Sequence, residues 1–285
     1  MVTPDNDPSP APFGAFAPTA AQAALIRLAH GSGLKRGAFR PWLSRLTSLL
    51  RAGPIDVQYQ GGSFRFHHQA SATERGALFN PDYNRQELDF LRANLPDGGV
   101  FVDIGANVGT YALSLARDVG PHGMVIAVEP HPVIHARLAF NRAASGFAQV
   151  RLVAAAAGEA DGEVMIETDS ANLAASHVVT GTPTAGAFKV PCVTLQHILA
   201  EAGASRIDAL KIDVEGFEDR VLTGFFAQAP QALWPRRILT HVLLQEGKDP
   251  AAAELALRAV LELAPEDKEA TKNLSVLLRG QGTPA

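Results

Sequence analysis

The sequence of this 285-residue chain lacks the features that mark disulfide-linked, zinc-binding, membrane-spanning and nucleic-acid-binding proteins. The single cysteine, Cys192, cannot form an internal disulfide, and one thiol does not make a zinc knuckle. No uninterrupted apolar run approaches the roughly 18 residues that a membrane-spanning helix requires, so we expect no membrane span. The 25 lysines and arginines are outnumbered by 29 acidic residues, which gives a formal charge of −4. A slightly acidic chain has no global field to hold nucleic acid or anionic lipid, so neither is an expected partner.

The N-terminus also lacks the basic segment and apolar core of a secretory signal peptide, and the sequence therefore predicts a cytoplasmic protein. A hydrophobic content of 47% with 19% charged residues is ordinary for a folded protein with a buried core. At roughly 150 residues per domain, the length allows one large domain or two modest ones.

Common catalytic motifs are absent as well. There is no Gly-x-Gly-x-x-Gly run of a dinucleotide fold and no phosphate-binding loop ending in Gly-Lys-Ser/Thr. The nine histidines show no metal-ligand spacing, and no Gly-x-Ser-x-Gly elbow supplies a hydrolase nucleophile. These absences argue against nicotinamide chemistry, nucleotide hydrolysis, a metal centre and serine hydrolysis.

What is present divides the chain into four parts. Residues 1–20 are rich in proline and alanine and predict a disordered leader. Residues 21–80 show helical periodicity and then two alternating runs around Gly61 and Gly62, which is typical of a β-hairpin. We expect the main domain at residues 81–244 and a helical tail at residues 245–285.

The main domain alternates buried strands with helices. The expected strands are residues 100–104, 124–128, 150–155, 163–167, 188–193 and 207–214. The expected helices are residues 110–118, 132–144, 195–202 and 218–227. This alternation predicts an α/β fold, with a mostly parallel, doubly wound sheet of the Rossmann-like type.

The first strand of this domain ends in Asp103, Gly105, Asn107 and Gly109. Gly105 permits a sharp turn and lets a ligand approach the backbone, while the Asp103 carboxylate could hold an ammonium group. Asn107 can both donate and accept hydrogen bonds, and the following helix N-terminus favours a carboxylate. The set suits a zwitterionic amino-acid group better than a pyrophosphate. A purely structural turn is the alternative.

The second strand ends in Glu129, an acid placed to accept hydrogen bonds from both hydroxyls of a ribose. Taken alone, such a residue is more often a solvated charge at a strand end. Together with Asp103 and Gly105, it indicates a nucleoside joined to an amino acid, and the expected cofactor is S-adenosyl-L-methionine.

The third informative strand end carries Lys211, Asp213 and Glu215, which alternation places on one side. We interpret Asp213 and Glu215 as the catalytic candidates, because a carboxylate there could orient or deprotonate an acceptor hydroxyl. Two carboxylates could also hold a divalent cation. The structural alternative is that Glu215 and Glu218 only favour the dipole of the next helix.

These motifs resemble the FkbM-like methyltransferases over about residues 80–235. The resemblance rests on the segments Phe101 to Gly109, Val128 to Pro130 and Leu210 to Glu218, together with Asn141. It implies a class I methyltransferase fold and methyl transfer to an oxygen of a sugar or natural-product scaffold.

The resemblance also implies site roles. It places Asp103, Gly105 and Asn107 at the methionine end of the cofactor and Glu129 at the ribose. It places Ala156 or Ala157 near the adenine and Asp213 near the transferred methyl. The expected partner is a small-molecule or glycan acceptor.

The C-terminal part departs from such proteins, whose sheets continue past a fifth core strand into an antiparallel pair. Residues 237–244 could be that fifth strand or already a helix, and the tail from residue 249 has only helical periodicity. The tail resembles part of a tetratricopeptide repeat and could bind a protein partner; a helical pair packed on the sheet is the alternative. We therefore expect a sheet truncated at its far edge. The second functional hypothesis is a weak or inactive cofactor-binding protein that acts through this tail.

Overall fold

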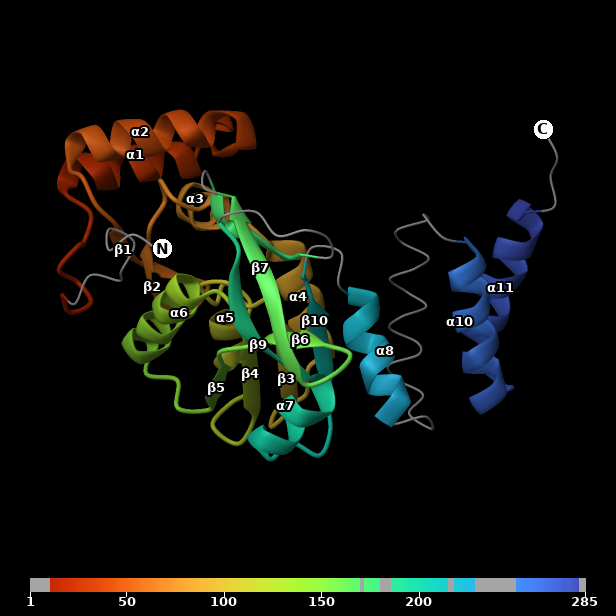
Figure 1. The fold of residues 1–285 in the computed structure, drawn as a ribbon. Helices are drawn as coiled ribbons and strands as arrows, with labels where there is room; N and C mark the ends of the chain where they lie inside the picture. The colour runs from red at the N-terminus through yellow and green to blue at the C-terminus, as the bar shows by residue number, and fades with distance from the viewer. Residues whose placement is uncertain (1–10, 170–171, 180–185, 215–217, 229–249, 282–285) are drawn as a thin grey trace.

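The computed structural model describes residues 11–169, 172–179, 186–214, 218–228 and 250–281 (Figure 1). An N-terminal layer of helices and a β-hairpin packs on a central parallel sheet, and a second sheet lies beside it. Within these residues, no helix is both long and apolar enough to cross a lipid bilayer.

The N-terminal layer contains four α-helices, two short 3₁₀ turns and a hairpin. Its elements are α1 (Ala20–His30), η2 (Gly33–Lys35), η3 (Gly37–Phe39), α2 (Arg40–Leu50), β1 (Ile55–Tyr59), β2 (Gly62–Phe66), α3 (Ala72–Phe79) and α4 (Arg85–Asn94).

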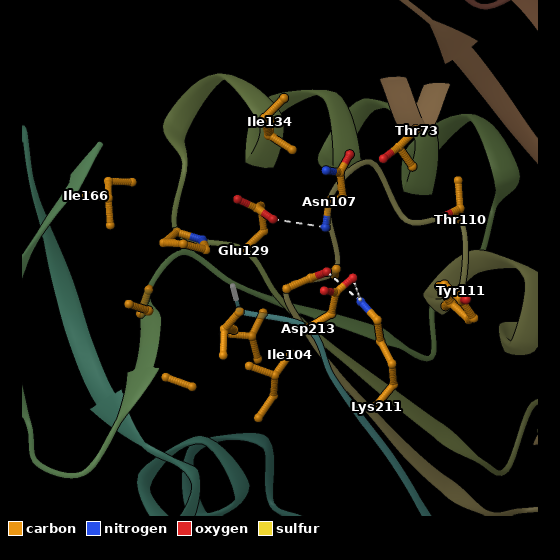
Figure 2. Close-up of a pocket in the computed structure, with 18 of the residues that line it drawn as sticks. Thr73, Ile104, Asn107, Thr110, Tyr111, Glu129, Ile134, Ile166, Lys211 and Asp213 are labelled. Atoms are coloured by element: carbon orange, nitrogen blue, oxygen red, sulfur yellow. Dashed lines mark hydrogen bonds and ion pairs between the residues drawn. The ribbon is translucent and has the colours of Figure 1, made fainter. Parts of the chain in front are cut away.

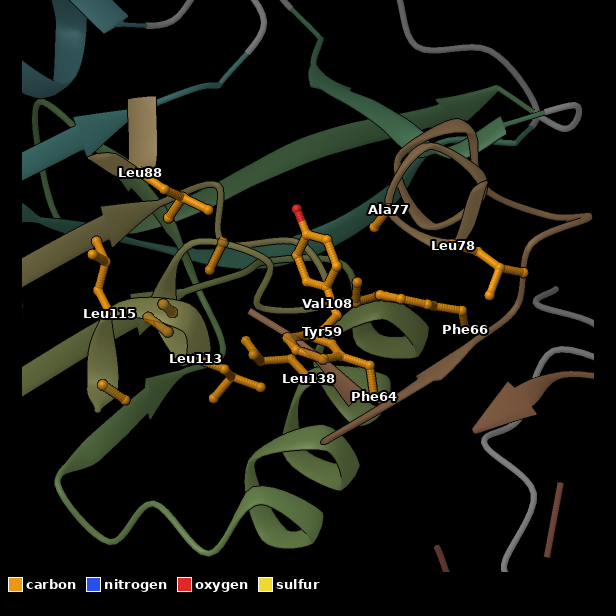
Figure 3. Packing of buried hydrophobic residues seen from close by; sticks show 14 of the residues in the cluster. Tyr59, Phe64, Phe66, Ala77, Leu78, Leu88, Val108, Leu113, Leu115 and Leu138 are labelled. Carbon is orange, nitrogen blue, oxygen red and sulfur yellow. The ribbon is translucent and has the colours of Figure 1, made fainter. Parts of the chain in front are cut away.

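The predicted hairpin is present, but its turn lies one residue earlier than the glycine pair. Gln60 and Gly61 take the positive φ angles, of 47° and 90°, and Gly62 already pairs with Tyr59. Aromatic side chains of the hairpin, Tyr59, Phe64 and Phe66, pack against helices of the main domain (Figure 3). The hairpin is therefore joined to the main domain through a shared core.

Residues 11–19 differ from the expected disordered leader, whose first ten residues lie outside the described part of the chain. The Arg65 guanidinium, 1% exposed, donates to the carbonyl oxygens of Ala11 and Pro12 and pairs with Asp56 at 2.7 Å. Asp56 in turn accepts the backbone N–H groups of Gly14 and Phe16. A buried guanidinium needs several acceptors, and this segment supplies two of them.

The central sheet has the order β10-β3-β4-β5, all parallel. Its strands are β3 (Val100–Ile104), β4 (Met124–Val128), β5 (Val150–Val153) and β10 (Ala209–Ile212). The chain runs outward from β3 through β4 to β5 and returns to the other side of β3 as β10. Ligands of open parallel sheets bind at such a reversal, beyond the carboxyl ends of the strands.

The second sheet has the order β6-β9-β7-β8 and is mixed. Its strands are β6 (Ala156–Gly158), β7 (Gly162–Asp169), β8 (Asn172–Val178) and β9 (Phe188–Thr194). β6 runs parallel to β9, whereas β7 is antiparallel to both of its neighbours. The prediction of a single strand at residues 150–155 is wrong. The chain leaves the central sheet after Val153 and joins the second sheet at Ala156.

Helices cover both faces of the central sheet, as the predicted α/β fold requires. They are α5 (Ala112–Ala116), α6 (Pro132–Ser145), α7 (Leu195–Ala202) and α8 (Glu218–Gln228). Alternate residues of β3 belong to two different cores: Phe101 packs in the core that contains the hairpin, and Val102 in the core that contains α7 and α8. Burial on both faces explains the continuous apolar runs of these strands.

Two helices form the described part of the tail, α10 (Pro250–Leu263) and α11 (Lys268–Gln281). They pack on each other through Leu257, Val260 and Ala270, which confirms the predicted helical character. Residues 237–244, which could be a fifth strand or already a helix, lie outside the described residues, so the truncated sheet stays a prediction.

The buried pair Asp56–Arg65 gives a stability prediction. Replacing Asp56 with Ala leaves the Arg65 charge buried without its carboxylate, and we expect a loss of about 3–5 kcal/mol in the free energy of unfolding. Urea denaturation measures this change. The matched control is Glu163→Ala, whose partner Lys189 is 67% exposed, and it should cost less than about 1 kcal/mol. Equal losses in the two variants would contradict the central role of the buried pair.

Candidate functional site

A cavity of about 200 Å³ lies beyond the carboxyl ends of β3, β4 and β10 (Figure 2). Its floor comes from the turn after β3 and from the end of β10. One wall is apolar and comes from β6, β7 and α6, while the opposite wall comes from α3, the turn before α4 and the turn before α5. The cavity therefore sits at the reversal of strand order.

The turn after β3 depends on Gly105, which has a φ of +76° and lines the cavity. A Cβ atom at this position would overlap the carbonyl oxygen of Asp213, so only glycine lets β3 and β10 end this close together. Asn107 also lines the cavity and has a φ of +52°, and its side-chain Oδ1 accepts the N–H of Val108.

Gly109, expected beside the cofactor, does not line the cavity. Its φ is +93°, and a Cβ atom there would lie 2.7 Å from a methyl carbon of Leu138. The structure therefore gives Gly109 a packing role, in which it brings the turn close to α6.

Asp103, expected to face an ammonium group of the ligand, is completely buried and does not line the cavity either. Its Oδ2 accepts the N–H of Ala112 at 3.1 Å, and its Oδ1 lies 3.2 Å from the Nζ of Lys211. Asp103 thus faces the ammonium group of a protein side chain that itself lines the cavity.

Lys211 lines the cavity and connects three groups at its floor. Its Nζ donates to the carbonyl oxygen of Gly105 at 2.8 Å and lies 3.5 Å from Oδ2 of Asp213 (Figure 2). Burial by itself would lower the pKa of Lys211, but the neighbouring carboxylates of Asp103 and Asp213 raise it above its usual value. Lys211 is therefore a cation. Strand alternation correctly predicted that it lies on the same side as Asp213, but it did not reveal the ion pair with Asp103.

Glu129 lines the cavity with only 6% of its surface exposed. One carboxylate oxygen accepts the N–H of Asn107 and the other that of His131, each at 2.9 Å. Each oxygen keeps capacity for one more donor, which suits two adjacent hydroxyl groups. Burial raises the pKa of Glu129 to about 7, although both backbone donors oppose the shift.

The apolar wall lies next to Glu129. It contains Ala156 and Ala157, the two candidates from the sequence, together with Ala155, Ile134 and Ile166. These small and branched side chains leave a slot without charges, which suits a flat ring system.

Of the two catalytic candidates, Asp213 lines the cavity and Glu215 lies outside the described residues. The Asp213 side chain is 66% exposed, in contrast to the buried Asp103 and Glu129. It is therefore the acidic side chain of the cavity floor that a second ligand can reach. Over the described ranges, no group of three or more histidine, cysteine or acidic residues is arranged to hold a metal ion.

The opposite wall was not predicted from the sequence. It consists of polar, uncharged side chains, namely Thr73, Tyr83, Asn84, Thr110 and Tyr111. Thr73, Tyr83 and Asn84 come from the N-terminal layer, and no motif links them to the strand ends. The sequence offers only an indirect signal, which is the residue type. Asparagine tolerates a left-handed backbone, and both Asn84 and Asn107 adopt one.

Comparison with known proteins identifies the family. The model of the methyltransferase FkbM domain matches residues 103–254, more than half of the chain. The chain is 33% identical over 162 residues to methyltransferase sdnD of Sordaria araneosa, a match that covers 46% of this chain and 62% of that protein. It is 24% identical over 192 residues to hexuronic acid methyltransferase AglP of Haloferax volcanii, covering 67% of this chain and 75% of that protein.

Among solved structures, TYW2 of M. jannaschii in complex with AdoMet matches with 19% identity and a TM-score of 0.28, over 35% of this chain and 42% of that one. The match to the family model, over residues 103–254, includes the strand ends that build the cavity. The parallel sheet with its cavity at the strand reversal, and the family match that begins at Asp103, agree with each other. The chain belongs to the FkbM family of methyltransferase domains, whose cofactor is S-adenosyl-L-methionine.

Proposed function

We propose that the chain is an O-methyltransferase that acts on a hydroxyl group of a small molecule or glycan. The observation that carries this proposal is the exposed carboxylate of Asp213, held by Lys211 beside the Gly105 turn at the cavity floor. A carboxylate in this place can accept the proton of an acceptor hydroxyl.

The residues of the cavity fit S-adenosyl-L-methionine. Glu129 has the free acceptor capacity for the two ribose hydroxyls, and the alanines of β6 border a slot for the adenine ring. Gly105 and Asn107 line the cavity next to Lys211 and would border the methionine end of the cofactor. Asp103 would support this end indirectly, by holding Lys211.

The charge balance supports the same cofactor. The carboxyl groups of Asp213 and the buried Asp103 outnumber the single ammonium of Lys211 in this cluster, and Glu129 adds negative charge when it is ionised. A negative cavity favours a ligand that carries both an ammonium and a sulfonium group.

The protein itself forms no covalent bond in the proposed reaction. Bound S-adenosyl-L-methionine supplies a methyl group made electrophilic by the sulfonium. Asp213 would orient the acceptor hydroxyl and take its proton when the methyl group is transferred to that oxygen, with S-adenosylhomocysteine as the leaving product. Lys211, whose Nζ lies 3.5 Å from Oδ2 of Asp213, would help to fix the position of this carboxylate beside the acceptor.

The acceptor class is supported by a relative. AglP is named for methylation of a hexuronic acid, and a sugar acceptor agrees with the polar wall opposite Glu129.

The raised pKa of Glu129 gives a prediction for cofactor binding. The ribose hydroxyls need the ionised carboxylate as acceptor, and with a pKa of about 7 this form is the minor one at pH 6 and the major one at pH 8. Affinity for S-adenosylhomocysteine should therefore increase roughly tenfold from pH 6 to pH 8, measured by calorimetric titration. Burial lowers the pKa of neighbouring His131, which moves its titration toward the acid end of this range.

The control for this experiment is Glu129→Gln. Its amide has no charge to titrate, so binding should be weaker than in the wild type and constant over the same pH range. A wild-type affinity that does not change between pH 6 and pH 8 would contradict the role of Glu129.

Removal of the Asp213 carboxylate tests the proposed activity. Asp213→Asn should lower the turnover number by about 10²- to 10⁴-fold, the usual contribution of a general base, while the affinity for S-adenosylhomocysteine changes less than about threefold. Transfer of labelled methyl from S-adenosyl-L-methionine to a panel of methyl glycosides measures turnover. The matched control is Asp89→Asn, an exposed aspartate on α4, which should retain full activity.

Two outcomes would contradict the proposal. Full activity of Asp213→Asn would remove Asp213 from the chemistry. A wild-type protein that binds S-adenosylhomocysteine but transfers no methyl group would favour the second hypothesis, that of a cofactor-binding protein that acts through its helical tail.

A further inference from the structure

Part of the cavity wall opposite Glu129 comes from the N-terminal layer, and the proposed cofactor contacts do not use this part. Thr73 belongs to the first turn of α3, and Tyr83 and Asn84 form the turn that leads into α4. Figure 2 shows Thr73 on the side of the cavity away from Ile166 and the apolar slot. We propose that the Thr73, Tyr83 and Asn84 wall is the acceptor subsite and that it selects a neutral polyhydroxylated acceptor. This inference rests on the proposed methyl transfer.

The first argument is the conformation of Asn84. Its backbone is left-handed, with φ 58° and ψ 18°, and it occupies the N-cap position of α4. An asparagine at this position usually accepts a backbone N–H of the first helical turn, but the Asn84 side chain makes no such bond. Asn84 lines the cavity. Asparagine tolerates this backbone, and without a capping bond its carboxamide remains available to a ligand.

The second argument is that this turn is held rigidly. The ring of Tyr83 lies against Gly76 of α3, where a Cβ atom would be 2.6 Å from the ring. The hydroxyl of Tyr59 donates to the carbonyl oxygen of Tyr83, and the Arg40 guanidinium lies 5.4 Å from the centre of its ring. A binding wall fixed before the ligand arrives loses little conformational entropy on binding.

The same rigidity extends to the residues beside the turn. Asp82 pairs with Lys35 of the N-terminal layer at 2.8 Å and with Arg85 of α4 at 2.7 Å. The turn therefore has contacts on both of its sides, and its residues Tyr83 and Asn84 line the cavity.

The third argument concerns charge. Glu129, Lys211 and Asp213 are the charged side chains among the described residues that line the cavity. The Lys211 ammonium donates to the Gly105 carbonyl and forms ion pairs with the carboxylates of Asp103 and Asp213, so its charge is already balanced. The described lining therefore offers no further cation to pair with an acceptor carboxylate, so the preferred acceptor is uncharged. In this respect the chain would differ from AglP, which is named for a hexuronic acid.

The chemistry of the wall matches adjacent hydroxyl groups. A carboxamide both donates and accepts hydrogen bonds, and the hydroxyls of Thr73 and Tyr83 do the same. Such a set recognises the alternating donors and acceptors of a sugar ring without needing charge.

The test uses the full chain loaded with S-adenosylhomocysteine, with loading verified by calorimetry. Binding of a panel of neutral methyl hexosides and of methyl glucuronide is then measured by saturation-transfer NMR and titration. We expect at least one neutral glycoside to bind, and to bind more tightly than the glucuronide. In Asn84→Gly, which keeps the left-handed backbone and removes the amide, its affinity should fall roughly tenfold, as expected for the loss of one or two hydrogen bonds.

The matched control is Gln60→Gly, because Gln60 is also left-handed but lies at the hairpin turn and does not line the cavity. This variant should bind the glycoside as the wild type does. Both variants should bind S-adenosylhomocysteine with unchanged affinity, which a general loss of folding would not allow.

The outcomes separate this inference from the proposed function. Failure to bind S-adenosylhomocysteine would overturn the proposed function itself. A loaded protein that binds no neutral glycoside of the panel, that prefers the glucuronide, or that binds equally well as Asn84→Gly would overturn the acceptor subsite and leave the cofactor assignment in place.

Discussion

A buried ammonium between two aspartates holds the floor of the site together. The register of the central sheet pairs Lys211 of β10 directly with Asp103 of β3, so the two side chains emerge side by side. From this position Lys211 also binds the Gly105 carbonyl and approaches Asp213. A buried charge is costly unless it is paired and hydrogen-bonded, so loss of either partner would affect the whole floor.

The turn after β3 connects this floor to the rest of the molecule. Asn141 of α6 donates to the Val108 carbonyl in this turn and accepts the N–H of Arg65 in the hairpin. Arg137, one helical turn earlier on α6, forms a buried pair with Glu74 of α3 at 2.8 Å. The helix α6 therefore contacts the hairpin, α3 and the turn at the cavity, and it fixes their relative positions. The N-terminal layer is part of the site through these contacts.

Some sequence patterns predicted strands and cavity residues correctly, and others did not. The strands at residues 100–104 and 124–128 were predicted with their observed bounds, because strands buried on both faces are continuous apolar runs. The same runs end at the edge where ligands bind, so Gly105, Asn107, Glu129 and Asp213 could be named as site residues and all line the cavity. Asp103 and Gly109 share this motif, but packing turned the first toward Lys211 and the second toward α6.

The sequence by itself determined the α/β class, the family and the strand ends that bear the site, because these depend on local periodicity and on short motifs. Tertiary structure alone decided that Lys211 neutralises Asp103, that residues 11–19 are bound by Asp56 and Arg65, and that Thr73, Tyr83 and Asn84 face the cavity. Each of these contacts joins segments that are distant along the chain, and their side chains carry no periodic pattern that would reveal the pairing. The physical reason is that local sequence sets the backbone of each element, whereas buried charges and polar groups find their partners only when the elements pack.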